Sequence, residues 1–124
     1  MGHQVGDQLL CHLVNLCRQQ LRNIDRLGRY GGEEFVVLMP ETAAEGAMQA
    51  AERLREKIEK MRINTPAGKL SITVSMGVAT LERGFDETHT LDTLIKSADG
   101  ALYAAKAAGR NCVRQGKENI RSVP

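Results

Sequence analysis

This sequence has few aromatic residues and no large excess of positive or negative charge. Phe and Tyr together make up 3% of the 124 residues and Trp is absent. The chain therefore has too few aromatic side chains to form a surface on which nucleic-acid bases stack. Seventeen basic and 15 acidic residues leave a formal net charge of +2, and no stretch clusters Lys and Arg. These features argue against nucleic acid as a partner.

Long hydrophobic runs and paired cysteines are also missing. No apolar run approaches the roughly 20 residues that span a bilayer, so we expect no membrane contact by this segment. Cys11, Cys17 and Cys112 are an odd number without CxxC spacing and without a preceding signal peptide, which is typical of reduced thiols in the cytoplasm. Cys17 shares a helical spacing with Val14 and Leu21, which predicts a small buried hydrophobic residue.

Apolar periodicity predicts three amphipathic helices in a chain whose length suits one domain. The first covers residues 7–24, with Ile24 in its buried stripe. The second covers residues 42–61 and opens on a capping-box pattern. The third runs from about residue 91 to a C-terminal stop at Gly109.

The remaining apolar segments predict strands. Residues 29–39 form a β-hairpin with Gly31-Gly32 as its turn, since glycine adopts positive φ without a Cβ clash. The strand over 33–39 lacks polar alternation and is expected in the middle of a sheet, buried on both faces. Alternation over 70–78 predicts a half-buried strand, and 111–114 a short edge strand. The order α-β-β-α-β-α-β predicts the α+β class, with helices packed on a largely antiparallel sheet.

Two adjacent carboxylates, Glu33 and Glu34, directly follow the Gly-Gly turn. One interpretation is an exposed hairpin tip where both groups are solvated. The other is a metal and phosphate site, in which the glycines let the backbone approach a nucleotide and the carboxylates hold divalent cations.

The flanking residues carry a family resemblance. The stretch Arg29-Tyr30-Gly31-Gly32-Glu33-Glu34-Phe35 resembles the signature of GGDEF domains, the catalytic domains of diguanylate cyclases, with Glu in place of Asp. Residues 2–7, 74–79 and 98–111 are similar to further motifs of that family in order and spacing. The resemblance implies a nucleotidyl-cyclase-like palm with a ferredoxin-like core over residues 1–114, followed by a polar tail over 115–124.

The resemblance implies an enzyme that condenses two GTP molecules into cyclic di-GMP with release of pyrophosphate. The intact domain would work as a cytoplasmic homodimer, with two Mg²⁺ or Mn²⁺ ions per active site. Glu33 matches the metal ligand and suggested base, and Glu34 a second acidic position near the metals. The substrate contacts that the resemblance implies are His3 and Asp7 near guanine, Gly31 and Gly32 at the turn, and Lys106 and Arg110 on the β- and γ-phosphates.

Simpler interpretations exist for several of these residues. Asp7 also suits a helix N-terminus, and Lys106 and Arg110 suit a helix C-terminus, where cations face exposed carbonyls. The pair Arg22 and Asp25 matches the family's RxxD inhibitory motif, which binds the product cyclic di-GMP together with a second arginine at the position of Arg53. A lone RxxD is otherwise an i,i+3 surface ion pair of little energetic weight.

The sequence departs from the family at its start. The family's domain begins with a helix and a central strand that carry an Asp metal ligand, a Lys and an Asn, and none of these has a counterpart here. The resemblance therefore implies the larger C-terminal part of a longer domain. We expect the fragment itself to be inactive, and to be either a truncated piece of the domain or completed by another chain through strand exchange. The alternatives are a catalytically silent module that binds cyclic di-GMP and, less favoured, an oligomerisation domain without a ligand.

Overall fold

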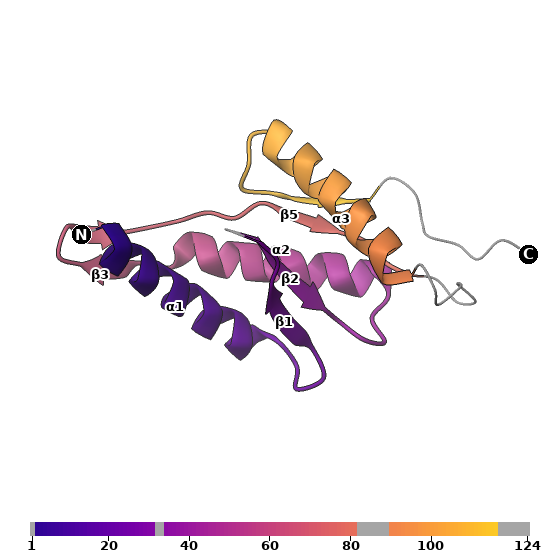
Figure 1. The fold of residues 1–124 in the computed structure, drawn as a ribbon, viewed down its shortest axis with the longest axis horizontal. Coiled ribbons are helices and arrows are strands. Elements are labelled where there is room, and N and C mark those ends of the chain that lie inside the picture. Colours follow the sequence, from indigo (N-terminus) through magenta and orange to yellow (C-terminus); the bar gives the residue numbers. More distant parts are fainter. Residues whose placement is uncertain (1, 32–33, 82–89, 117–124) are drawn as a thin grey trace, which may run out of the picture. The chain divides into compact units, whose positions relative to one another are not determined.

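The computed structural model describes residues 2–31, 34–81 and 90–116 (Figure 1). The chain divides into two compact units. The first comprises residues 1–41 and 60–72, and the second comprises residues 42–59 and 73–124. Each unit is described by itself.

The first unit opens with helix α1 (Gly2–Gln20), which begins earlier and ends earlier than the predicted span. The prediction of a buried Cys17 is confirmed. The helix ends because residues 22–25 form a turn in which the Asp25 N–H donates to the Arg22 carbonyl over 3.0 Å. Ile24 therefore lies outside the helix and is 47% exposed, so its predicted place in the buried stripe is wrong.

Strands β1 (Arg26–Arg29) and β2 (Phe35–Leu38) form the predicted antiparallel hairpin. Phe35 pairs with Arg29, and the Tyr30 N–H donates to the Glu34 carbonyl over 2.8 Å. Glu34 thus belongs to the turn, and the strand begins one residue later. Within the described part of the chain β2 pairs with β1 alone. Its residues are half-buried or exposed, so the prediction of a central strand buried on both faces is wrong.

A second antiparallel hairpin pairs β3 (Ile63–Thr65) with β4 (Gly68–Leu70). The single strand predicted over 70–78 is wrong, because it is divided between the units. Leu70 pairs with Ile63 in this hairpin, residues 71–75 lie outside strands, and the later residues belong to β5.

The second unit contains α2 (Ala44–Lys60, of which residues 44–59 belong to it), β5 (Met76–Val78), α3 (Thr90–Ala107) and β6 (Val113–Gln115). Figure 1 shows α3 lying along β5, which pairs with β6 in parallel. The helix approaches closely because Gly77 has no side chain: a Cβ there would lie 2.0 Å from the Ala98 carbonyl oxygen. Ala101 and Ala105 are buried at this contact.

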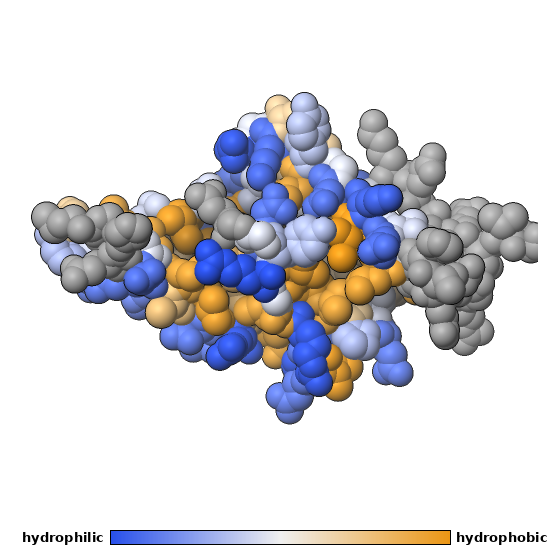
Figure 2. All heavy atoms as spheres, in the orientation of Figure 1, coloured by the Kyte–Doolittle hydropathy of each residue, from blue (hydrophilic) through white to orange (hydrophobic). Residues whose placement is uncertain are grey.

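These elements confirm the α+β class, with two antiparallel hairpins and one parallel pair. Helices α2 and α3 confirm the second and third predicted helices, and α2 buries Ala47, Leu54 and Ile58. The three cysteines are free. Figure 2 shows hydrophobic residues at the visible face. The large hydrophobic side chains that are exposed in the described part of the chain are Ile24, Tyr30 and Leu38 in the first unit and Leu81, Leu91 and Tyr103 in the second. None of the helices that the structure describes combines the length and hydrophobicity needed to cross a bilayer.

Candidate functional site

The β1–β2 turn carries the paired glutamates. Gly31 enters the turn with φ of +73°, in the left-handed region that glycine tolerates. The half-buried Glu34 follows the turn. Its carbonyl oxygen accepts a hydrogen bond from the Tyr30 N–H, next to the strand pair of Arg29 and Phe35. Gly32 and Glu33 lie outside the described residues. In the part of the chain that the structure describes, no three His, Cys, Asp or Glu side chains gather as they would around a metal ion.

His3 and Asp7 both belong to α1. They are four residues apart along the helix. The alternative interpretation of Asp7 as a first-turn residue is wrong, because the helix begins at Gly2 and its first turn contains no acidic residue. Asp7 is exposed, so its carboxylate lies in solvent rather than in a cap.

Lys106 and Arg110 flank the C-terminus of α3, and the backbone there explains their placement. The Gly109 N–H donates to the Lys106 carbonyl over 3.3 Å, and the Arg110 N–H donates to the Ala105 carbonyl over 3.0 Å. This pair of bonds is the Schellman pattern, with Gly109 in the left-handed region at φ of +113°. The predicted stop at Gly109 is confirmed, and both exposed cations lie at the same helix end.

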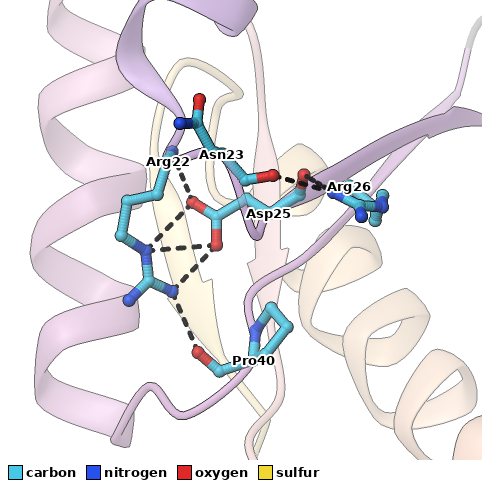
Figure 3. A network of polar contacts seen from close by, with 5 residues as sticks. All are labelled: Arg22, Asn23, Asp25, Arg26 and Pro40. Atoms are coloured by element: carbon cyan, nitrogen blue, oxygen red, sulfur yellow. Dashed lines mark hydrogen bonds and ion pairs between the residues drawn. The ribbon is translucent and has the colours of Figure 1, made fainter.

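Arg22 and Asp25 contact each other in the turn after α1, as Figure 3 shows. The Asp25 carboxylate accepts the Arg22 backbone N–H over 2.8 Å, Nη2 over 2.8 Å and Nε over 3.2 Å. Arg22 Nη2 also donates to the Pro40 carbonyl over 3.0 Å, which joins the turn to the end of β2. The i,i+3 ion pair is therefore present, but it differs from an ordinary surface pair because the Asp25 side chain is only 1% exposed.

The electrostatics of this turn follow from those contacts. Hydrogen bonds from Arg22 hold the pKa of Asp25 below its usual value, against the opposing effect of burial. The same bonds raise the pKa of the Arg22 guanidinium. Arg26 Nη1 reinforces the turn by donating to the carbonyls of Asn23 and Asp25 over 2.9 and 3.1 Å (Figure 3). Arg53, the third residue predicted for this site, is exposed on α2 and belongs to the other unit.

A polar cluster of α2 was not predicted from the sequence. Arg55, whose side chain is 13% exposed, contacts Glu52 and Glu59 on its own helix and donates to Asn111 Oδ1 over 2.9 Å. Asn111 Nδ2 donates to Glu59 Oε2 over 2.5 Å. The helical spacing of the three charged residues is visible in the sequence, but nothing there indicates Asn111 as their partner.

Comparison with known protein families identifies the family of this chain. Residues 1–112 match the family model described as diguanylate cyclase, GGDEF domain. The chain belongs to the GGDEF family. The chain is 38% identical over 119 residues to diguanylate cyclase A of Treponema denticola, which covers 96% of the chain and 31% of that relative. The chain therefore spans about a third of the length of this curated relative.

Solved GGDEF structures are similar to this chain as well. The GGDEF domain of DgcB from Caulobacter crescentus, solved in complex with c-di-GMP, superposes with a TM-score of 0.83 at 30% identity, over 95% of this chain and 68% of that one. The active GGEEF domain of a diguanylate cyclase from Vibrio cholerae superposes with a TM-score of 0.80 at 29% identity, over 92% of this chain and 70% of that one. The same palm-like fold thus occurs with the GGEEF form of the turn.

Proposed function

We propose that this GGDEF domain forms the catalytic part of a diguanylate cyclase that condenses two GTP molecules into cyclic di-GMP. The observation that carries the proposal is the Gly-Gly-Glu-Glu-Phe sequence, which falls between β1 and β2 and includes the first residue of β2; the two strands pair as an antiparallel hairpin. The similar domain from Vibrio cholerae is described as active with the same GGEEF turn.

The proposed reaction is an in-line displacement at phosphorus. The ribose 3′-hydroxyl of one GTP attacks the α-phosphorus of the other, and the new P–O bond forms as the bond to pyrophosphate breaks. A second such step closes the ring, so two pyrophosphates are released. Each half-site of a homodimer holds one GTP, and the reaction takes place in the cytoplasm, where the substrate is made.

Glu33 and Glu34 are proposed to hold Mg²⁺ or Mn²⁺, two per active site, because carboxylate oxygens are the hard ligands that these ions prefer. When bound, the ions neutralise charge on the phosphoryl oxygens. Glu33 also accepts the proton of the attacking hydroxyl in this proposal. The backbone of Glu34 is fixed by the hydrogen bond from the Tyr30 N–H to its carbonyl, and the residue is half-buried.

The remaining residues bind the nucleotide. Lys106 and Arg110 contact the β- and γ-phosphates, and their exposed positions at one helix end leave both cations accessible to a triphosphate. Asp7 accepts hydrogen bonds from the guanine edge, and His3, one helical turn away, is a neighbouring substrate contact. Gly31 and Gly32 let the backbone approach the substrate.

A domain exchange tests the enzymatic proposal. This chain replaces the matched 119-residue region of the Treponema denticola relative, and GTP turnover is measured with Mg²⁺. We expect the chimera to make cyclic di-GMP, Glu33→Gln to lower the rate by roughly 100- to 10,000-fold, and Glu45→Gln, an exposed change on α2, to leave it unchanged. The isolated chain, which we propose to be inactive, is assayed beside the chimera. An inactive chimera that binds cyclic di-GMP would favour the silent binding module.

A second proposed function is product binding at Arg22, Asp25 and Arg53. The half-exposed Arg22 guanidinium is held in one orientation by Asp25, which suits recognition of a phosphate or a guanine Hoogsteen edge. We expect Arg22→Ala to weaken cyclic di-GMP binding at least about tenfold, the loss of one charge-assisted hydrogen bond. Arg18→Ala, at the last turn of the same helix, is the matched control. Equal affinity of the Arg22 variant and the wild type would contradict this assignment.

A further inference from the structure

The turn that carries Arg110 has an unusual backbone. Gly109, Arg110 and Asn111 have positive φ values of 113°, 65° and 49° in succession. Glycine adopts this region freely and asparagine tolerates it, but an arginine has no local hydrogen bond of its own to favour it. The conformation of Arg110 must therefore be imposed by contacts on either side of it.

The contacts before Arg110 come from the end of α3. The Arg110 N–H donates to the Ala105 carbonyl over 3.0 Å, which is the outer bond of the Schellman pattern. The same carbonyl accepts from Cys112 Sγ over 3.4 Å. The Cys112 carbonyl in turn accepts the Met76 N–H over 3.0 Å, so the chain after the turn is tied to the start of β5.

The contacts after Arg110 come from α2 through the side chain of Asn111. Its Oδ1 accepts from Arg55 Nη1 over 2.9 Å, and its Nδ2 donates to Glu59 Oε2 over 2.5 Å. Arg55 Nη1 also lies 3.5 Å from Glu59 Oε1, so the three side chains form a closed ring of contacts. The Asn111 amide both donates to the carboxylate and accepts from the guanidinium, so aspartate, alanine and glycine at this position each lose at least one of these bonds.

We infer that Asn111 is a positioning residue for the triphosphate of GTP, because it anchors the left-handed turn that presents Arg110 beside Lys106. Arg110 is the contact and Asn111 acts through it. The inference rests on the proposed function, in which both cations bind the β- and γ-phosphates. The hydrogen bonds of the Asn111 amide to Arg55 and Glu59 on α2, here called the amide clamp, restrict the conformation of Arg110 before the nucleotide binds. Less conformational entropy is therefore lost when Arg110 binds the phosphates.

The test compares affinities of the full 124-residue chain for GTP and for GMP, each with Mg²⁺, by calorimetry. GMP lacks the β- and γ-phosphates, so the ratio of the two affinities reports the phosphate contacts alone. Arg110→Ala is expected to lower this ratio roughly 10- to 100-fold. Asn111→Gly keeps a turn that the backbone accepts while removing the amide clamp, and we expect it to lower the ratio by at least about tenfold. Asn111→Asp, which keeps the acceptor for Arg55, is expected to give a smaller loss.

Two further measurements separate positioning from general stability. The double variant Arg110→Ala with Asn111→Gly is expected to have the same ratio of GTP to GMP affinity as Arg110→Ala alone. Once the Arg110 side chain is removed, Asn111 no longer affects phosphate binding through it. Amide exchange at residue 110 is expected to accelerate in Asn111→Gly. Lys57→Ala, an exposed change on α2, is the control and leaves the ratio and the exchange unchanged.

The outcomes distinguish the two proposals. If Arg110→Ala leaves the GTP to GMP ratio unchanged, the proposed phosphate contact fails and the inference fails with it. If Arg110→Ala lowers the ratio while both Asn111 variants keep it, the proposed contact stands and the positioning role is overturned. Additive losses in the double variant also overturn it, because they assign Asn111 a contribution independent of Arg110.

Discussion

The contacts of Asp25 give this residue a structural role that its sequence motif does not indicate. Its carboxylate accepts hydrogen bonds from the backbone N–H and the guanidinium of Arg22, and its side chain is almost fully buried. A cyclic di-GMP guanine that bound this carboxylate would have to share it with Arg22. Asp25 therefore has a structural role in the turn in addition to the proposed contact with product.

The lowered pKa of Asp25 predicts a defined pH dependence. Its folded-state pKa lies below the unfolded value of about 3.9, so its contribution to stability is complete above that value and is lost as pH falls through the folded pKa. We expect Asp25→Asn to lower the free energy of unfolding by about 1–2 kcal/mol at pH 7. The difference from wild type should shrink below about pH 4. Urea unfolding at several pH values measures both.

The control for this experiment is Asp99→Asn, because Asp99 is exposed on α3. Its effect should stay small at every pH, as expected for an exposed side chain. A stability difference for Asp25→Asn that persists unchanged at pH 2 would contradict the assigned ion pair.

The sequence predicted part of this residue-scale picture. The RxxD spacing indicated that Arg22 and Asp25 belong together. It did not indicate the burial of Asp25 or the bond from Arg22 to the Pro40 carbonyl, because Pro40 lies 18 residues further along the chain and approaches only through the β1–β2 hairpin. Similarly, Asn111 was part of a recognised motif, but its partners lie 52 and 56 residues away.

At the scale of elements, the contact between α3 and β5 depends on a single glycine. A Cβ on Gly77 would lie 2.0 Å from the Ala98 oxygen and 2.4 Å from the Leu102 nitrogen, both backbone atoms that a side-chain rotation cannot move. We expect Gly77→Ala to lower the free energy of unfolding by about 1–3 kcal/mol through overpacking. Thermal or urea unfolding followed by circular dichroism measures the change.

Gly100 provides a matched control with the opposite sign. It lies within α3, is exposed, and has no atom within 4 Å of the position of an added Cβ. Because alanine is the better helix former, Gly100→Ala should stabilise the chain by up to about 1 kcal/mol. A Gly77→Ala variant that is as stable as the wild type, or more stable, would contradict the close contact at Gly77.

Elements defined by local pattern were predicted more accurately than elements defined by pairing. Helix α3 and its stop at Gly109 follow from apolar spacing and from the one residue that accepts a left-handed C-terminus. The alternation over 70–78 was real, but it did not show that Leu70 pairs with Ile63 while Met76 pairs with Val113. Strand pairing is a non-local property, so one alternating run was read as one strand.

The same limit applies to the whole molecule. The apolar run at Phe35 predicted a central strand, whereas the described residues contain three two-stranded sheets. Hydrophobicity shows that a strand needs cover on both faces, but it does not show which segment supplies that cover. Tyr30, directly after β1, and Leu38, within the run, remain exposed. The family was nevertheless recognisable, because its motifs lie in turns and helix ends, where local chemistry restricts the residue type.

The two units are expected to differ in local stability. Neither β1 nor β2 contains a fully buried residue, and a two-stranded hairpin is marginally stable by itself. In the second unit, α3 packs against β5 and contains the buried Ala101 and Ala105, and Val113 of β6 is buried. Hydrogen exchange followed by mass spectrometry should therefore show faster exchange in residues 26–38 than in residues 98–107. Equal protection of the two segments would mean that both open in a single cooperative transition, and would contradict the division of stability inferred from burial.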